Sequence, residues 1–116
     1  MDTEFAARIT FLPEFSNIRP TSEFVAEVRY PDISSPPWSV RFRLWSPPNE
    51  NGFALAWASF LMPNAPAAEL SRLSSFMLTL GGRPVATCAL EVKPERAAVI
   101  ERDFLEHPEY PVRAAA

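Results

Sequence analysis

The sequence predicts a mainly β fold: a small antiparallel six-stranded β-barrel with a short helical insertion and a short C-terminal helix. Short segments alternate between apolar and polar residues with a period of two, which is typical of strands that bury one face. Most of the 13 prolines gather between these segments, where a residue without a backbone N–H donor is tolerated. Two of the three glycines stand side by side at positions 81 and 82, as expected of a tight hairpin turn.

The first three strands are predicted over residues 4–12, 23–30 and 38–45. Each segment alternates cleanly, so one face of each strand is apolar and the other is polar. The residues expected to point inward are, in chain order, Phe5, Ala7, Ile9, Phe11, Phe24, Ala26, Val28, Tyr30, Trp38, Val40, Phe42 and Leu44.

The second and third strands are expected to pair as an antiparallel hairpin with Tyr30 opposite Trp38. The apolar faces of the two strands then agree in register. The same register places Glu27 opposite Arg41, a cross-strand pair of opposite charge that stabilises a sheet.

Residues 52–62 are apolar at almost every position. This composition is typical of a strand with both faces covered, and equally of a buried helix. The flanking glycine and proline and the aromatic residues favour a strand. A short helix is then expected over 64–73, where Asn64 is a capping residue and Pro66 stands near the helix start.

The glycine pair separates the last two strands, predicted over 76–80 and 84–92. A two-residue loop would turn the apolar rows of the two strands to opposite faces, because a slip of one residue flips every side chain. A three-residue loop with Arg83 at its tip keeps them on one face, so we expect that loop. It pairs Leu78 with Ala86 and Phe76 with Cys88.

The 116 residues form one domain. We expect the barrel over 1–93, a C-terminal helix over 94–106 that packs on the barrel and closes one of its ends, and a flexible tail over 107–116. Pro94 suits a helix start. The apolar residues of the helix at helical spacing are Ala97, Ile100 and Phe104.

Three segments resemble the third, C-terminal β-barrel domain of translation elongation factor Tu and its small stand-alone relatives. They are the opening FAARITFLP, the strand–turn–strand segment ASFLMPNAPAAELSRLSSFML and the hairpin LGGRPVATCALEV. The resemblance covers roughly residues 4–93 and implies the barrel fold. No GxxxxGK[ST] loop and no GTPase domain are present, so nucleotide binding is not implied, and the function stays open.

The charge balance disfavours several partner classes. A net charge of -3 with scattered arginines gives no field that attracts a phosphate backbone, so we expect no nucleic-acid partner. No apolar stretch approaches the length of a membrane span, so we expect no membrane partner. Cys88 is the single cysteine and the N-terminus shows no secretion signal, which favours a cytoplasmic protein.

The sequence is poor in residues for catalysis. His107 is the single histidine and lies in the predicted tail, while Cys88 lies on the inward row of its strand. General acid–base catalysis and zinc binding both need more such residues close together. The carboxylates near the C-terminus, such as Glu95 and Glu106, match a solvated helix face. We therefore expect that the protein is not an enzyme and that it has no catalytic residue, no metal site and no cofactor.

A protein-binding surface is predicted at Arg41, Arg43 and Trp45. Trp45 is out of phase with its strand and so shares the face of the two arginines, and tryptophan and arginine are frequent in interface hot spots. Alternatively, the C-terminal helix or the proline-rich loop covers Trp45. Either Trp57 or Phe60 must also face away from the barrel interior, since they stand three residues apart.

The sequence thus predicts a noncatalytic protein-binding module that binds a protein partner or its own copy. The alternative is a small immunity or inhibitor protein that neutralises an effector by occlusion. A convergence of Glu23, Glu27 and Glu91 into an acidic stripe would favour the inhibitor. An enzyme and a ligand-carrying barrel rank below both.

Overall fold

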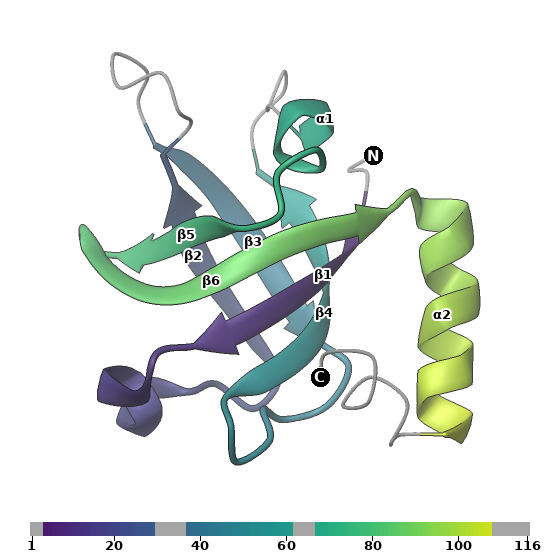
Figure 1. Ribbon diagram of the computed structural model, residues 1–116, viewed down its shortest axis with the longest axis horizontal. Helices are drawn as coiled ribbons and strands as arrows, with labels where there is room; N and C mark the ends of the chain where they lie inside the picture. The colour runs from purple at the N-terminus through teal and green to yellow at the C-terminus, as the bar shows by residue number, and fades with distance from the viewer. Residues whose placement is uncertain (1–3, 30–36, 62–66, 108–116) are drawn as a thin grey trace.

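A computed structural model of the chain describes residues 4–29, 37–61 and 67–107. Six strands form a closed antiparallel barrel in the order β1-β4-β3-β2-β5-β6 (Figure 1), which confirms the predicted fold class. The elements in chain order are β1 (Glu4–Phe11), η1 (Pro13–Ile18), β2 (Glu23–Val28), β3 (Trp38–Leu44), β4 (Phe53–Phe60), α1 (Ala67–Leu70), β5 (Phe76–Leu80), β6 (Arg83–Val92) and α2 (Pro94–Glu106).

Apolar side chains from all six strands fill the barrel interior, as the alternation of the first three strands predicts for their own residues. The largest fully buried members are Phe42, Ile9, Leu70 and Leu78. Leu70 comes from α1, which lies over one end of the barrel (Figure 1). The interior is therefore a packed core, and its burial of apolar surface stabilises the fold.

Strand β4 is buried on both faces, as its continuous apolar pattern predicts. Phe60 points inward and joins the barrel core, whereas Trp57 points outward and packs with Ala6 and Ala97 in a second, smaller core. Trp57 is thus the residue that faces away from the barrel interior. Helix α2 covers it.

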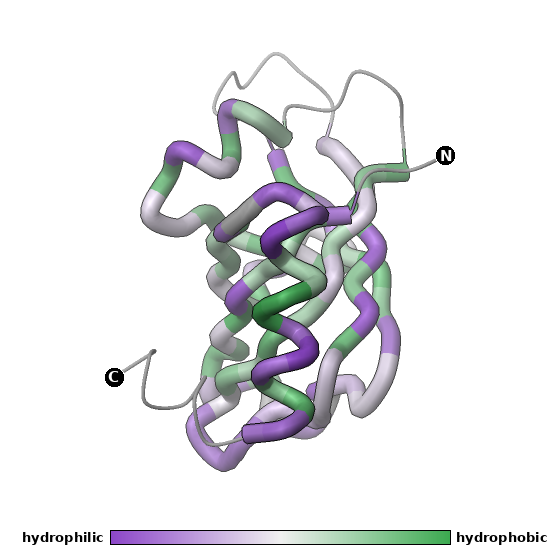
Figure 2. The backbone as a smooth tube through the Cα atoms, turned by 90° about the vertical axis from the view of Figure 1, so that its right-hand side faces the viewer, coloured by the Kyte–Doolittle hydropathy of each residue, from purple (hydrophilic) through white to green (hydrophobic). Residues whose placement is uncertain are grey.

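Helix α2 lies along the barrel wall (Figure 1), so the expectation that it closes an end was wrong. Ala97 and Phe104 are buried, seven residues and two turns apart. Ile100 was expected beside them but is exposed, because it lies on the flank of the helix. Hydrophilic and hydrophobic residues both appear along α2 in Figure 2. No helix in the described ranges is long and apolar enough to cross a membrane.

The register of β2 and β3 differs from the prediction by two residues. Trp38 pairs with Val28, and Tyr30 lies outside the described residues. A shift of two leaves the same side chains on the same face, so the apolar pattern does not distinguish the two registers. The expected pair of Glu27 and Arg41 is also wrong, because Glu27 lies opposite Ser39.

The hairpin of β5 and β6 pairs Phe76 with Cys88 and Leu78 with Ala86, as predicted. Its loop was predicted wrongly: Leu80 pairs with Arg83 across a two-residue turn, and a register shift between Leu78 and Thr79 absorbs the extra residue. Such a β-bulge keeps the apolar rows on one face.

Both glycines of this turn adopt positive φ, 59° at Gly81 and 82° at Gly82, which glycine reaches without a steric penalty. Arg83 begins β6 and does not stand at the loop tip. Its guanidinium carbon lies 5.6 Å from the centroid of the Phe15 ring, a cation–π distance.

The short helices were the least predictable elements. Within the described residues, α1 is a single turn from Ala67 to Leu70, shorter than the predicted 64–73, and Asn64 and Pro66 lie outside those residues. Helix η1 was not predicted. It begins at Pro13, where proline suits a first helical position because the missing N–H has no helical partner.

Candidate functional site

Arg41 and Arg43 lie side by side on the outer face of β3, two residues apart and thus on the same face. Arg41 pairs with Glu23 of β2, with 3.7 Å between Nε and Oε1, and Arg43 pairs with Glu4 of β1, with 3.4 Å between Nη2 and Oε2. The arginine side chains remain 52% and 57% exposed. The structure therefore places both guanidinium groups at the surface, each beside a carboxylate.

An apolar residue lies within this charged surface. Val25 of β2 is the cross-strand partner of Arg41, and it is 44% exposed. We call the surface formed by Glu23, Val25, Arg41 and Arg43 the β2–β3 face. Exposed apolar and arginine side chains in one place are typical of protein-binding surfaces. Val25 was not among the predicted site residues, because the alternation alone marks it only as outward.

Trp45 is half-buried, and it is covered by α2. Its ring centroid lies 5.9 Å from that of Trp57 and 5.8 Å from that of Phe104 in α2. Its backbone N–H donates to the carbonyl of Leu55, with 2.8 Å between the atoms, which extends the pairing of β3 and β4. Of the two alternatives left by the sequence, the structure shows the covered one. The structure thus brings Arg41 and Arg43 together and places Trp45 beneath the helix.

The acidic residues do not gather in a stripe. Glu23 pairs with Arg41, and Glu91 pairs with Arg8 at 2.5 Å between Oε1 and Nε. Glu27 lies opposite Thr79 of β5. Two of the three carboxylates thus have an arginine on a neighbouring strand.

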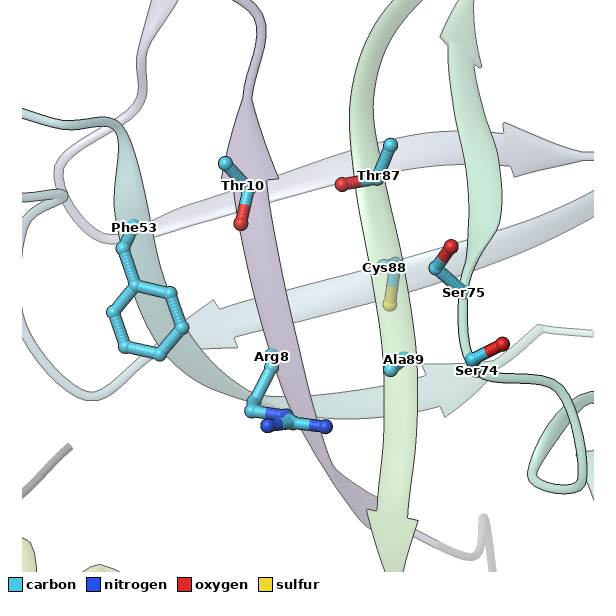
Figure 3. A pocket seen from close by; sticks show the side chains of 8 residues that line it. All are labelled: Arg8, Thr10, Phe53, Ser74, Ser75, Thr87, Cys88 and Ala89. Carbon is cyan, nitrogen blue, oxygen red and sulfur yellow. The ribbon is translucent and has the colours of Figure 1, made fainter. Parts of the chain in front are cut away.

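A polar hollow of about 160 Å³ lies on a different part of the barrel wall (Figure 3). Thr10 of β1 and Thr87 of β6 are cross-strand partners in its floor, and Arg8 stands beside them. Its lining residues are Arg8, Thr10, Phe53, Ser74, Ser75, Thr87, Cys88 and Ala89. Since Glu91 already pairs with Arg8, the hollow offers hydroxyl groups and no unpaired charge.

Cys88 is buried in the barrel, and His107 directly follows α2. Cys88 is 1% exposed, and burial raises the pKa of its thiol, which disfavours the nucleophilic thiolate. His107 is the C-cap of α2, and its backbone N–H donates to the carbonyl of Asp103 at 2.8 Å. Within residues 4–29, 37–61 and 67–107, no group of three or more His, Cys, Asp or Glu side chains is placed to hold a metal ion.

The resemblance to the elongation factor domain rests on three sequence segments within residues 4–93. That resemblance stays a prediction. Comparison of the chain with family models, with curated proteins and with solved structures finds no match.

Proposed function

We propose that the chain is a noncatalytic protein-binding module built on a barrel like the third domain of elongation factor Tu. Its binding surface is the β2–β3 face, which takes a protein partner or a second copy of the chain. The observation that carries the proposal is the exposure of Arg41 and Arg43 on one strand face, with the exposed Val25 opposite Arg41.

The ion pairs of this face suit exchange with a partner. Exposed pairs between arginine and a carboxylate contribute about 0–1 kcal/mol, so a partner's carboxylates can replace Glu23 or Glu4 with little loss. Val25 adds apolar surface that a partner would bury.

Trp45 has a structural role in this proposal, through its contacts with Trp57 and Phe104. Trp57, on which its ring packs, is the cross-strand partner of Arg43. The ring cluster of Trp45, Trp57 and Phe104 thereby fixes α2 next to the β2–β3 face. In the proposal, Arg41 and Arg43 contact the partner and Trp45 holds the adjoining helix.

The immunity or inhibitor protein has less support. An acidic stripe would favour it, but Glu23 and Glu91 pair with different arginines. Catalysis, nucleic-acid binding, membrane binding and cofactors are not part of the proposal, since the net charge is -3 and Cys88 is buried. A cytoplasmic location belongs to the proposal because the chain has a single cysteine.

A charge reversal tests the proposal. The double variant Arg41→Glu/Arg43→Glu is compared with Arg72→Glu/Arg102→Glu, which changes the net charge equally at exposed arginines outside the β2–β3 face. We measure the solution mass by light scattering and the recovery of bound proteins from the native host. The first variant should lose self-association or the specific partner, and the second should keep it. Equal behaviour of both variants would contradict the proposal.

A further inference from the structure

A second hollow lies at the end of the barrel where α1 and the start of α2 are found (Figure 1). Its volume is about 690 Å³, within the range of about 300–1,000 Å³ that is usual for small-molecule sites. Ala68 of α1 and Ser71 line one side, and Lys93, Pro94 and Arg96 line the other. None of the lining residues belongs to the β2–β3 face.

Three apolar residues line this hollow. Phe5 of β1 is half-buried and packs against the barrel core, and Pro94 is half-buried in the first turn of α2. Ala68 is exposed, and its small side chain leaves the space beside it open. A ligand with an apolar body would remove this surface from water, and such burial favours association.

The lining also carries an excess of positive charge. Lys93 and Arg96 are exposed, and their side chains form no ion pair within the residues that the structure describes. The acidic lining residue, Glu91, pairs with Arg8 at 2.5 Å between Oε1 and Nε, so its charge is compensated. Glu95 stands between the two cations in the sequence but does not line the hollow. The two uncompensated cations therefore favour an anion.

These features together favour a ligand with an apolar part and an anionic part. A purely apolar ligand would take water away from Lys93 and Arg96 without giving either a partner, which costs free energy. A small hydrophilic anion would pair with the two cations but leave the apolar lining in water. A carboxylate suits the cations because a guanidinium can donate two parallel hydrogen bonds to it.

We propose that this hollow binds a small amphipathic carboxylate, a molecule with an apolar body and one carboxylate group. The apolar body lies against Phe5, Ala68 and Pro94. The carboxylate lies beside Lys93 and Arg96, whose long stems cover apolar surface while their charged ends stay at the rim. The inference goes beyond the proposed function, because it assigns a small-molecule site apart from the β2–β3 face and outside the packed barrel core.

The direct test is a nuclear magnetic resonance titration of the full chain with sodium octanoate, which has an apolar chain and is ionised at neutral pH. The amide signals of Ala68, Ser71 and Lys93 should shift and saturate, with a dissociation constant of about 1 mM or below. Acetate lacks the apolar chain and 1-octanol lacks the charge, so each should bind at least about fivefold more weakly. Shifts that do not saturate, or equal binding of octanoate and octanol, would overturn the proposal.

Removal of the two charges tests the place of the carboxylate. The variant Lys93→Gln/Arg96→Gln should bind octanoate about tenfold more weakly, since two attractive charges are lost, and should bind octanol as the wild type does. The matched variant Arg83→Gln/Arg102→Gln removes the same charge at exposed arginines outside the lining and should keep the wild-type affinity. Equal losses in both variants would overturn the assignment of the two cations to the site.

Occlusion of the hollow tests the place of the apolar body. Because Ala68 is exposed, the ring of Ala68→Trp should fill the hollow without entering the core, and octanoate binding should fall at least about tenfold. The matched variant Ala98→Trp makes the same change at an exposed position of α2 outside the lining and should bind as the wild type does. Unchanged binding by Ala68→Trp would overturn the proposal. The comparison of octanoate with octanol requires no variant, so it holds even where a variant fails to fold.

Discussion

The ring of Trp45, directly after β3, packs on the ring of Phe104 in α2 with 5.8 Å between the centroids. A second contact of 5.9 Å joins Trp45 to Trp57 of β4. Three aromatic rings thus connect the barrel wall to the C-terminal helix. Aromatic pairs at such distances stabilise a structure beyond the effect of area burial alone.

The Trp45→Ala variant should lower the free energy of unfolding by about 2–3 kcal/mol, because it removes a half-buried ring between two others. Amide hydrogen exchange in α2 should become faster than in the barrel strands. Chemical denaturation and hydrogen exchange measure the two effects. The control is Leu105→Ala on the same helix, an exposed residue whose change should stay within about 0.5 kcal/mol. Equal losses in both variants would mean that the rings do not hold the helix.

Gly52 and Gly82 have nearly the same φ, 81° and 82°, but different surroundings. A Cβ atom at Gly52 would lie 2.8 Å from the carbonyl oxygen of Phe11, whereas one at Gly82 meets nothing within 4 Å. Gly82→Ala should therefore lower stability by about 1–2 kcal/mol from backbone strain alone. Gly52→Ala should lower it further, since the strand must also shift. Thermal denaturation checks the order, and equal losses would show that the contact with Phe11 is relaxed at no cost.

The buried thiol of Cys88 predicts a pH dependence. Burial raises its pKa above the usual 9.0, so the folded protein keeps the proton that the unfolded chain loses. Stability from this group is complete below pH 9 and falls above it, by about 1.4 kcal/mol per pH unit. The stability difference between the wild type and Cys88→Ala should shrink accordingly as the pH rises above 9. A constant difference in urea denaturation from neutral to alkaline pH would contradict a buried thiol.

The sequence predicted which side chains face the core more reliably than which residues are paired. Alternation specifies a face, and the interior positions of β1 and β3 agree with it. A register shift of two residues leaves every side chain on the same face. The alternation therefore could not show that Trp38 pairs with Val28 and not with Tyr30. In the hairpin of β5 and β6, the predicted pairs of Phe76 and Leu78 are present, but the predicted loop length is wrong. A bulge between Leu78 and Thr79 allows these pairs to form across a shorter turn.

The candidate site was predictable only in part. The phase of Trp45 placed it on the outer face beside Arg43, but the residue that covers it, Phe104, comes from a distant helix. Val25 is exposed because α2 packs on another part of the barrel wall, at Ala6 and Trp57. The position of the helix on the barrel is likewise not contained in any local pattern.

Photo-cross-linking in the native host tests the central claim most directly. A photoreactive residue is introduced at Val25 on the β2–β3 face or at Val99 on α2, positions with similar exposures of 44% and 46%. The account predicts a specific adduct, with a second copy or with one partner protein, from position 25 and none from position 99. Equal adducts from both positions, or an adduct from position 99 alone, would contradict the assignment of the β2–β3 face as the binding surface.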